Sequence, residues 1–343
     1  MAMKTIGDCL VAHKMIRGDI FRGDYGIEVE TEAKKAYDYP QLKFWQCVAD
    51  GSLRNFGVEY IMKVPMPFEE VPIALEEIDF CNKKFKFLDS TVSTSVHVHI
   101  NMLTETPLAF ANFVTTYALV ESLLIRISGP DRKSNLFCLP LKDAEGNVEN
   151  IENVLRAFGA NVYKKIQLDP NRCKYSSLNI APLSSKGSIE IRTFRGETNT
   201  DLVYDWVKII HDIRQFSRQN INPKNIIDMF DRWGPEIINE IFPNTVHLVR
   251  NDLTLDQVRE LLFENLYNAS KFAVIKDKWD DTFGLPKPRK VYREKLTVIL
   301  NDYALNIFNI PYADLDKSQI NVIYERYLRD NPNVRIIDAD GDL

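Results

Sequence analysis

The stretch Gly26-Ile27-Glu28-Val29-Glu30 alternates apolar and acidic side chains with a period of two residues. Side chains i and i+2 of a β-strand share a face, so this period is typical of a strand with one face in the core. Alternation or β-branched enrichment predicts further strands, and the full set is 24–31, 58–64, 95–102, 175–180 and 188–194. Alternating strands favour an antiparallel sheet over a doubly wound parallel sheet, whose strands are apolar throughout.

Segments with helical spacing separate and follow these strands. Thr106 and Pro107 supply an N-cap and a proline suited to the first helical position, and Gly129-Pro130 ends that helix. Further helices are predicted from about residue 199 and over 68–80, 255–272, 291–305 and 317–328. We therefore expect an α+β fold, with a mostly antiparallel sheet and helices on one face in residues 1–216, and a mainly helical C-terminal region in residues 217–343.

The composition is that of an ordinary soluble globular protein, with 343 residues, 45% hydrophobic and 27% charged. The net charge of −5 gives no indication of nucleic-acid or anionic-membrane binding. The five cysteines are scattered and form no CxxC pair, which favours a reducing compartment. No signal peptide is recognisable and no stretch approaches a membrane span. We expect a cytoplasmic protein.

The polar faces of the predicted strands carry mainly carboxylates and imidazoles, whereas an exposed sheet face usually mixes Thr, Lys, Ser and Glu. The side chains expected on this shared face are Glu28, Glu30, Glu59, His97, His99, Glu190 and Arg192. Clustered carboxylates repel one another unless a cation lies among them, and Mg²⁺ prefers such oxygen ligands. Imidazole can join at Mn²⁺ or bind a phosphate. From spacing alone, a solvated sheet face is an equal alternative.

Other common catalytic motifs are absent from the sequence. It contains no GxxxxGK[ST], no GxGxxG after a strand, no GxSxG and no HExxH. His97 and His99 lack a third His or Cys at a spacing that would support a zinc site.

Several fragments follow one another in a recognisable order over residues 25–216. After Gly26–Glu30 come Trp45, Asp50-Gly51-Ser52-Leu53, Gly57-Val58-Glu59-Tyr60-Ile61, His97-Val98-His99-Ile100, Arg132…Asn135…Cys138…Pro140, Lys174-Tyr175…Leu178-Asn179, Gly187-Ser188-Ile189-Glu190-Ile191-Arg192-Thr193-Phe194 and Thr198 before Trp206. This order resembles the amidoligase family of the glutamine synthetase and glutamate–cysteine ligase superfamily. The segment 91–95 lacks the Cys-Gly of many members, and residues 142–150 resemble a local insertion.

The resemblance implies a glutamine synthetase-like curved sheet and an ATP-dependent carboxylate–amine ligase that forms an acyl phosphate. The implied cofactors are ATP and Mg²⁺, with Mn²⁺ as an alternative. The implied metal ligands are Glu28, Glu30, Glu59 and Glu190, and the implied catalytic residues are Arg192, Glu59 and Glu190. ATP contacts are expected from His97, His99, Arg132, Lys174 and Arg195. Weaker substrate candidates are Asp50, Ser52, Arg54 and Asn179.

The expected partners are a small-molecule or peptide carboxylate and an amine, without nucleic acid or membrane, and an oligomer is left open. Many family members occur in bacteriophages and bacteria, so the resemblance also implies a phage origin and a host cytoplasm. One alternative keeps the fold but phosphorylates a nitrogen acceptor, as guanidino kinases do. The other alternative is a catalytically inactive binding or virion-associated protein, although the retained carboxylates and Arg192 argue against it.

Overall fold

A computed structural model describes residues 5–12, 14–16, 23–88, 91–132, 135–136, 138–160, 166, 168–219, 222–276, 289–330 and 334–337. The chain divides into two compact units, residues 2–283 and residues 284–343. The sequence-based boundary at 216/217 falls inside a helix of the larger unit, and the helices from there to residue 276 share that unit's core.

The larger unit is built on one six-stranded sheet in which every neighbouring pair is antiparallel. Its strands are β1 (Tyr25–Thr31), β2 (Trp45–Ala49), β3 (Val58–Met62), β4 (Ser95–Asn101), β5 (Leu178–Asn179) and β6 (Ser188–Arg195). They lie in the order β2-β3-β1-β4-β6-β5. The predicted antiparallel sheet is confirmed, whereas its likeness to glutamine synthetase stays a prediction.

Two strands differ from the prediction for identifiable reasons. The strand predicted over 175–180 is reduced to β5, because the backbone around Ser176 pairs with Leu139 instead of continuing along β6. Strand β2 was not predicted, since this short edge strand lacks a clear alternation. Its first residue, Trp45, is buried and donates its indole N–H to the carbonyl oxygen of Ala74 at 2.8 Å.

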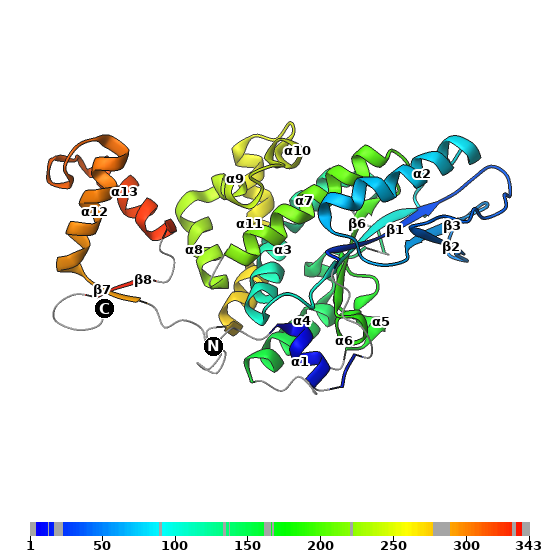
Figure 1. Ribbon diagram of the computed structural model, residues 1–343, viewed down its shortest axis with the longest axis horizontal. Coiled ribbons are helices and arrows are strands. Elements are labelled where there is room, and N and C mark those ends of the chain that lie inside the picture. Colours follow the sequence, from blue (N-terminus) through cyan, green and yellow to red (C-terminus); the bar gives the residue numbers. More distant parts are fainter. Residues whose placement is uncertain are drawn as a thin grey trace. The chain divides into compact units, whose positions relative to one another are not determined.

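The apolar face of the sheet packs on helices α2 (Val71–Phe85), α3 (Pro107–Ile127) and α7 (Thr200–Gln219), and these elements share one core. Figure 1 shows α2 and α7 lying along the same side of the sheet. The remaining helices of this unit are α1 (Ile6–Ala12), α4 (Glu145–Gly159), α5 (Pro170–Cys173), α6 (Leu183–Lys186), α8 (Pro223–Trp233), α9 (Ile237–Ile241), α10 (Val246–Arg250) and α11 (Leu255–Lys276). Single 3₁₀ turns occur at Phe68–Glu70, Pro130–Arg132, Leu141–Asp143 and Gly234–Glu236.

Helix α3 begins as its sequence predicts, because the Thr106 side chain accepts a hydrogen bond from the Ala109 N–H at the N-cap. The expectation that no stretch approaches a membrane span needs correction. The 21 residues of α3 are long and apolar enough for a span, yet nearly all of them are buried inside the fold. Helix α3 is the central core helix of this unit.

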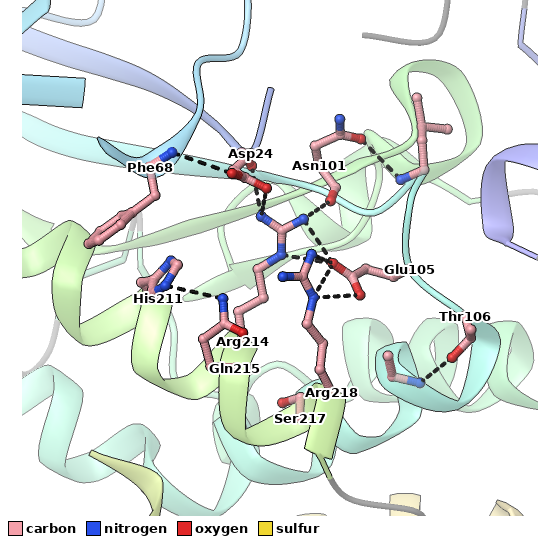
Figure 2. Close-up of polar contacts among 12 residues, drawn as sticks. Asp24, Phe68, Asn101, Glu105, Thr106, His211, Arg214, Gln215, Ser217 and Arg218 are labelled. Atoms are coloured by element: carbon pink, nitrogen blue, oxygen red, sulfur yellow. Dashed lines mark hydrogen bonds and ion pairs between the residues drawn. The ribbon is translucent and has the colours of Figure 1, made fainter. Parts of the chain in front are cut away.

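An ion-pair network ties α7 to the ends of two strands (Figure 2). Arg214 on α7 reaches Asp24, just before β1, and Glu105, in the turn between β4 and α3. It also donates to the carbonyl oxygen of Asn101 at the end of β4. The helix layer and the two central strands are therefore fixed relative to one another by charge as well as by apolar packing.

The smaller unit has its own secondary structure and its own core. It contains β7 (Arg289–Tyr292), α12 (Arg293–Phe308), a 3₁₀ turn (Tyr312–Asp314), α13 (Lys317–Asp330) and β8 (Val334–Ile337). Strands β7 and β8 pair in parallel, a feature that the prediction of a mainly helical C-terminal region did not include. Among the residues whose burial is described, its buried side chains are Leu296, Leu300, Ala304, Leu315, Ile323 and Tyr327.

Candidate active site

The candidate active site begins with one carboxylate held by two imidazoles. Strand pairing places Glu28 of β1 opposite His97 of β4, and His99 lies two residues further on the same face. His97 Nδ1 lies 3.1 Å from one Glu28 oxygen, and His99 Nε2 lies 3.0 Å from the other. The structure therefore brings both predicted histidines together on Glu28.

Strand β6 adds a second carboxylate from the other side of β4. Glu190 pairs with His99 in the sheet, and its Oε1 lies 3.2 Å from His97 Nδ1. The Asn179 side chain donates to the other Glu190 oxygen at 2.6 Å, and Arg192 forms an ion pair with Glu190. Asn179 thus orients a candidate metal ligand in this structure.

Glu30 and Glu59 complete the group of acidic residues. They lie directly opposite each other in the pairing of β1 with β3. The Ser95 hydroxyl donates to Glu30 at 2.6 Å and lies 2.7 Å from His97 Nε2. Sequence reasoning did not select Ser95, although its position two residues before His97 places it on the same strand face.

Within this carboxylate cluster (Glu28, Glu30, Glu59 and Glu190), the pKa values of two members are shifted in opposite directions. Burial raises the pKa of Glu59 to about 8, and the charges on Glu28 and Glu30 add to that effect. Burial alone would also raise the pKa of Glu28, but hydrogen bonds from His97 and His99 outweigh it and hold that pKa far below its usual range. One member of the cluster therefore resists ionisation while another is firmly charged.

The cluster fits a divalent metal by the chemistry of its donor atoms. Within the part of the chain that the structure describes, two sets of ligand atoms lie within 4.8 Å of one another. One set comprises Glu28, His99 and Glu190, and the other comprises Glu28, Glu59 and His97. Carboxylate oxygens with imidazole nitrogen suit Mn²⁺, and carboxylates with added phosphate or water oxygens suit Mg²⁺.

Arg192 shares the face of the cluster with Glu190, as alternation predicts, and a β-bulge begins at Arg192. The β4–β6 register runs from Val98↔Ile191 to Val96↔Phe194, so Arg192 and Thr193 together oppose His97. Strict alternation would put Phe194 on the polar face, but the bulge turns it into the core. Bulges of this kind often re-aim side chains beside active sites.

The three cationic side chains expected to contact ATP, those of Arg132, Lys174 and Arg195, lie in different surroundings. Arg132 is buried and donates to backbone carbonyl oxygens of β6. Arg195 forms an ion pair with Glu197 at 2.9 Å. Lys174 is exposed with its ammonium 4.6 Å from the centre of the Tyr175 ring, and no contact joins it to the cluster among the described residues. Their expected contacts with ATP stay predictions.

The loop between β2 and β3 carries three weaker candidates, Asp50, Ser52 and Arg54. Asp50 accepts hydrogen bonds from the Ser52 N–H and hydroxyl, and its charge also raises the pKa of Glu59. The buried Glu32 carboxylate accepts the Arg54 N–H at 2.7 Å, and it accepts the Ser93 hydroxyl as well. Glu32 lies two residues beyond Glu30, so the same alternation already placed it on this strand face.

A cavity of about 420 Å³ opens beside the cluster. Its lining includes Glu28 and His99, the ammonium-bearing side chains of Lys63 and Lys186, and apolar side chains such as Leu103. The size and the mixture of apolar walls with a few charged groups are those of a small-molecule site.

Comparison with known proteins gives one family. The family model described as "Putative amidoligase enzyme" matches residues 20–213, which is more than half of the chain. The match spans every member of the carboxylate cluster and Arg192. A search of curated proteins gave no match.

Proposed function

This chain belongs to the amidoligase family, and on that premise we propose that it is an ATP-dependent ligase that joins a carboxylate to an amine. The carboxylate attacks the γ-phosphoryl group of ATP, which forms an acyl phosphate and releases ADP. The neutral amine then attacks the acyl carbon, the C–O bond to phosphate breaks so that inorganic phosphate leaves with its electron pair, and the nitrogen releases one proton to solvent. The sum of the two steps is one amide, one ADP, one phosphate and one proton.

The observation that carries the proposal is the pair of ligand sets that share Glu28. A reaction between a carboxylate and a triphosphate brings two anions together, so neutralising their charge is the main requirement. Glu28, Glu59 and Glu190, with His97 and His99, would hold Mg²⁺ or Mn²⁺ there. Bound divalent metal would supply positive charge to the phosphate oxygens.

Arg192 is suited to act on the transferring phosphoryl group. Its Nη1 pairs with Glu190, while its buried Nε has no hydrogen-bond partner among the described residues. The Arg192 side chain is held by this ion pair and is 19% exposed, so its guanidinium can stabilise charge that develops during transfer. Loss of such a donor typically lowers kcat by roughly 10²–10³.

The cavity beside Glu28 and His99 is our candidate for the nucleotide. Apolar walls suit a base and ribose, while Lys63 and Lys186 would attract the phosphates toward the metal ligands. The acid and the amine would then approach from the Glu59 side, where Asp50 and Arg54 lie on the β2–β3 loop. This arrangement separates the nucleotide from the two substrates that are joined.

The test is a screen of carboxylate and amine pairs with ATP and MgCl₂. Phosphate release identifies active pairs, and mass spectrometry should find a product lighter by one water than the summed substrates. Arg192→Ala and Glu190→Gln should abolish turnover, whereas Glu76→Gln, at an exposed position on α2, should leave it unchanged.

The outcomes separate the alternatives. A stable phosphorylated amine without an amide would indicate a phosphotransferase. Absence of Mg²⁺-dependent ATP binding by calorimetry would indicate a binding protein without catalysis. Turnover that survives both site substitutions would show that the reaction occurs elsewhere in the molecule.

A further inference from the structure

Arg132 is a buried guanidinium that donates to backbone carbonyl groups and also hydrogen-bonds the Cys138 side chain. It ends the 3₁₀ turn at Pro130–Arg132, and only 4% of its surface is exposed. Its Nε donates to the carbonyl oxygen of Thr193 at 3.0 Å, and its Nη2 donates to that of Arg192 at 2.5 Å. Within the described residues it forms no ion pair. A buried charge without a carboxylate partner needs a specific reason.

The two carbonyls that it binds belong to the β-bulge. Because Arg192 and Thr193 together oppose the single residue His97, β4 cannot continue its regular ladder there. Arg132 supplies two N–H donors at that point. The Arg192 N–H donates to the carbonyl oxygen of Ser177 at 2.8 Å. The backbone at Arg192 is therefore held through both its carbonyl and its N–H group.

The bulge determines where the neighbouring side chains point. It leaves Arg192 on the site face in contact with Glu190, and it turns Phe194 into the core, where its ring stacks on Trp206 at 4.9 Å. A planar guanidinium is suited to hold two carbonyl groups in a fixed arrangement, whereas a lysine ammonium is a point charge on a flexible stem.

We propose that Arg132 is a positioning residue, which holds the Arg192–Thr193 bulge and so keeps Arg192 directed at Glu190 and the reacting phosphoryl group. The catalytic part of this statement rests on the proposed ligase function. The structural part does not, and it can be tested without any substrate. Arg132 then acts through Arg192 and does not contact ATP.

The substrate-free test uses Arg132→Ala and Arg132→Lys, with Arg259→Met as a control at an exposed arginine. Hydrogen exchange of the 188–196 segment should accelerate on the order of tenfold in Arg132→Ala, since two hydrogen bonds are lost. Lysine should restore only part of the protection. Low-millimolar ethylguanidinium should restore protection in Arg132→Ala, because it refills the vacated space and its donors. The Arg259→Met chain should exchange like the unmodified protein.

Phenylglyoxal labelling of Arg192 distinguishes local from global effects. Labelling of Arg192 should rise several-fold in both Arg132 variants, because its contact with Glu190 loosens. Arg214, which is 2% exposed and far along the sequence, should stay unlabelled. Exchange and Arg192 labelling that match the unmodified protein in both variants would overturn the proposal. A rise in Arg214 labelling in both variants would also overturn it, since Arg132 would then support the whole fold.

Calorimetry with MgATP separates positioning from direct phosphate binding. Arg132→Lys should not change MgATP affinity once Arg192 is already replaced by Met. An equal loss of affinity in the unmodified and the Arg192→Met backgrounds would show that Arg132 contacts phosphate itself, and the proposal would fail. If the unmodified chain shows no ligase activity, the proposed function fails, while the exchange and labelling results still decide the role of Arg132.

Discussion

Glu28 is the residue that both candidate metal sets share. It accepts hydrogen bonds from two histidines, and these hold its pKa far below its usual range against the effect of burial. A carboxylate that stays ionised under all ordinary conditions is a reliable ligand. Glu59, whose pKa burial and neighbouring charges raise to about 8, must lose its proton before it can bind a cation.

Glu28 belongs to both ligand sets and Glu59 to only one, which predicts unequal effects on metal binding. Glu28→Gln should weaken Mn²⁺ binding at both sets. The loss should be at least roughly 10–100-fold, which is typical when a residue that only hydrogen-bonds a metal ligand is removed. Glu59→Gln should weaken Mn²⁺ binding only at the set formed by Glu28, Glu59 and His97. Titration with Mn²⁺ followed by electron paramagnetic resonance measures both, with Glu76→Gln as the control. Equal losses in the two variants would contradict the shared role of Glu28.

Glu121 on α3 is a second buried carboxylate and lies outside the cluster. Burial raises its pKa to about 7, although the Ser177 hydroxyl and the Leu141 N–H both donate to it and oppose that rise. Its protonated form therefore adds stability that is complete below pH 4.5. That stability is lost as pH rises through about 7.

Glu121→Gln should remove this pH dependence, since a glutamine resembles the protonated acid. The free energy of unfolding of the variant, relative to the unmodified chain, should rise between pH 5 and pH 8. The rise should be a few kcal/mol at most, because one pKa unit corresponds to about 1.4 kcal/mol. Urea unfolding at constant ionic strength measures it. A constant difference across this range would show that the carboxyl titrates normally in the fold.

For single residues, the sequence predicts the location of a side chain wherever polar and apolar residues alternate along a strand. Alternation alone placed Glu28, Glu30, Glu59, His97, His99, Glu190 and Arg192 on one face, and the structure brings them together. Alternation could not show what each side chain bonds to. Ser95 and Glu32 follow the same period, but their roles depend on pairing between β1 and β4, which joins residues some 60 positions apart.

Among the elements, α7 is joined to the sheet by a polar network that the apolar pattern does not reveal. Arg214 is 2% exposed, and its guanidinium lies 2.8 Å from both Asp24 and Glu105 (Figure 2). Arg218, one turn later, also pairs with Glu105 but is partly exposed. The network fixes the start of β1 and the end of β4, the two strands that bring Glu28 to the histidines.

Arg214→Met should destabilise the chain by about 3–5 kcal/mol, because it leaves the buried Glu105 charge and the Asn101 carbonyl poorly satisfied. Arg218→Met should cost about 1 kcal/mol or less, since its partner keeps Arg214 and its own side chain reaches solvent. Urea unfolding followed by circular dichroism compares the two variants. Similar losses of unfolding free energy in the two variants would show that Arg214 stabilises the chain no more than Arg218 does.

A helix or strand could be predicted where its own residues show helical apolar spacing or strand alternation. The apolar spacing of α3 and α7 and the alternation of β1, β4 and β6 are local properties, so the prediction holds there. The edge strand β2, the short β5 and the bulge in β6 are set by partners distant in sequence. The bulge matters most, because alternation alone already puts Arg192 on the site face but would put Phe194 there too, and the bulge turns Phe194 into the core.

For the whole molecule, the division into two units separates the site from the C-terminal end. All candidate site residues lie between Glu28 and Arg195, and the core that supports them extends to Ile275. The core of the smaller unit contains none of those residues. The helices after residue 217 thus have two roles that the predicted single C-terminal region did not distinguish.

This division predicts that a chain ending at residue 283 keeps the site. Its Mn²⁺ affinity and melting temperature should match those of the full chain, because no buried residue of the main core is removed. A second chain ending at residue 216 is the matched comparison. It should lose most of its stability, because α11 contributes Val258, Leu262, Ala269 and Phe272 to the core around α3. If the first truncation also lowered Mn²⁺ affinity or the melting temperature, residues 284–343 would have to contact the larger unit and support its site.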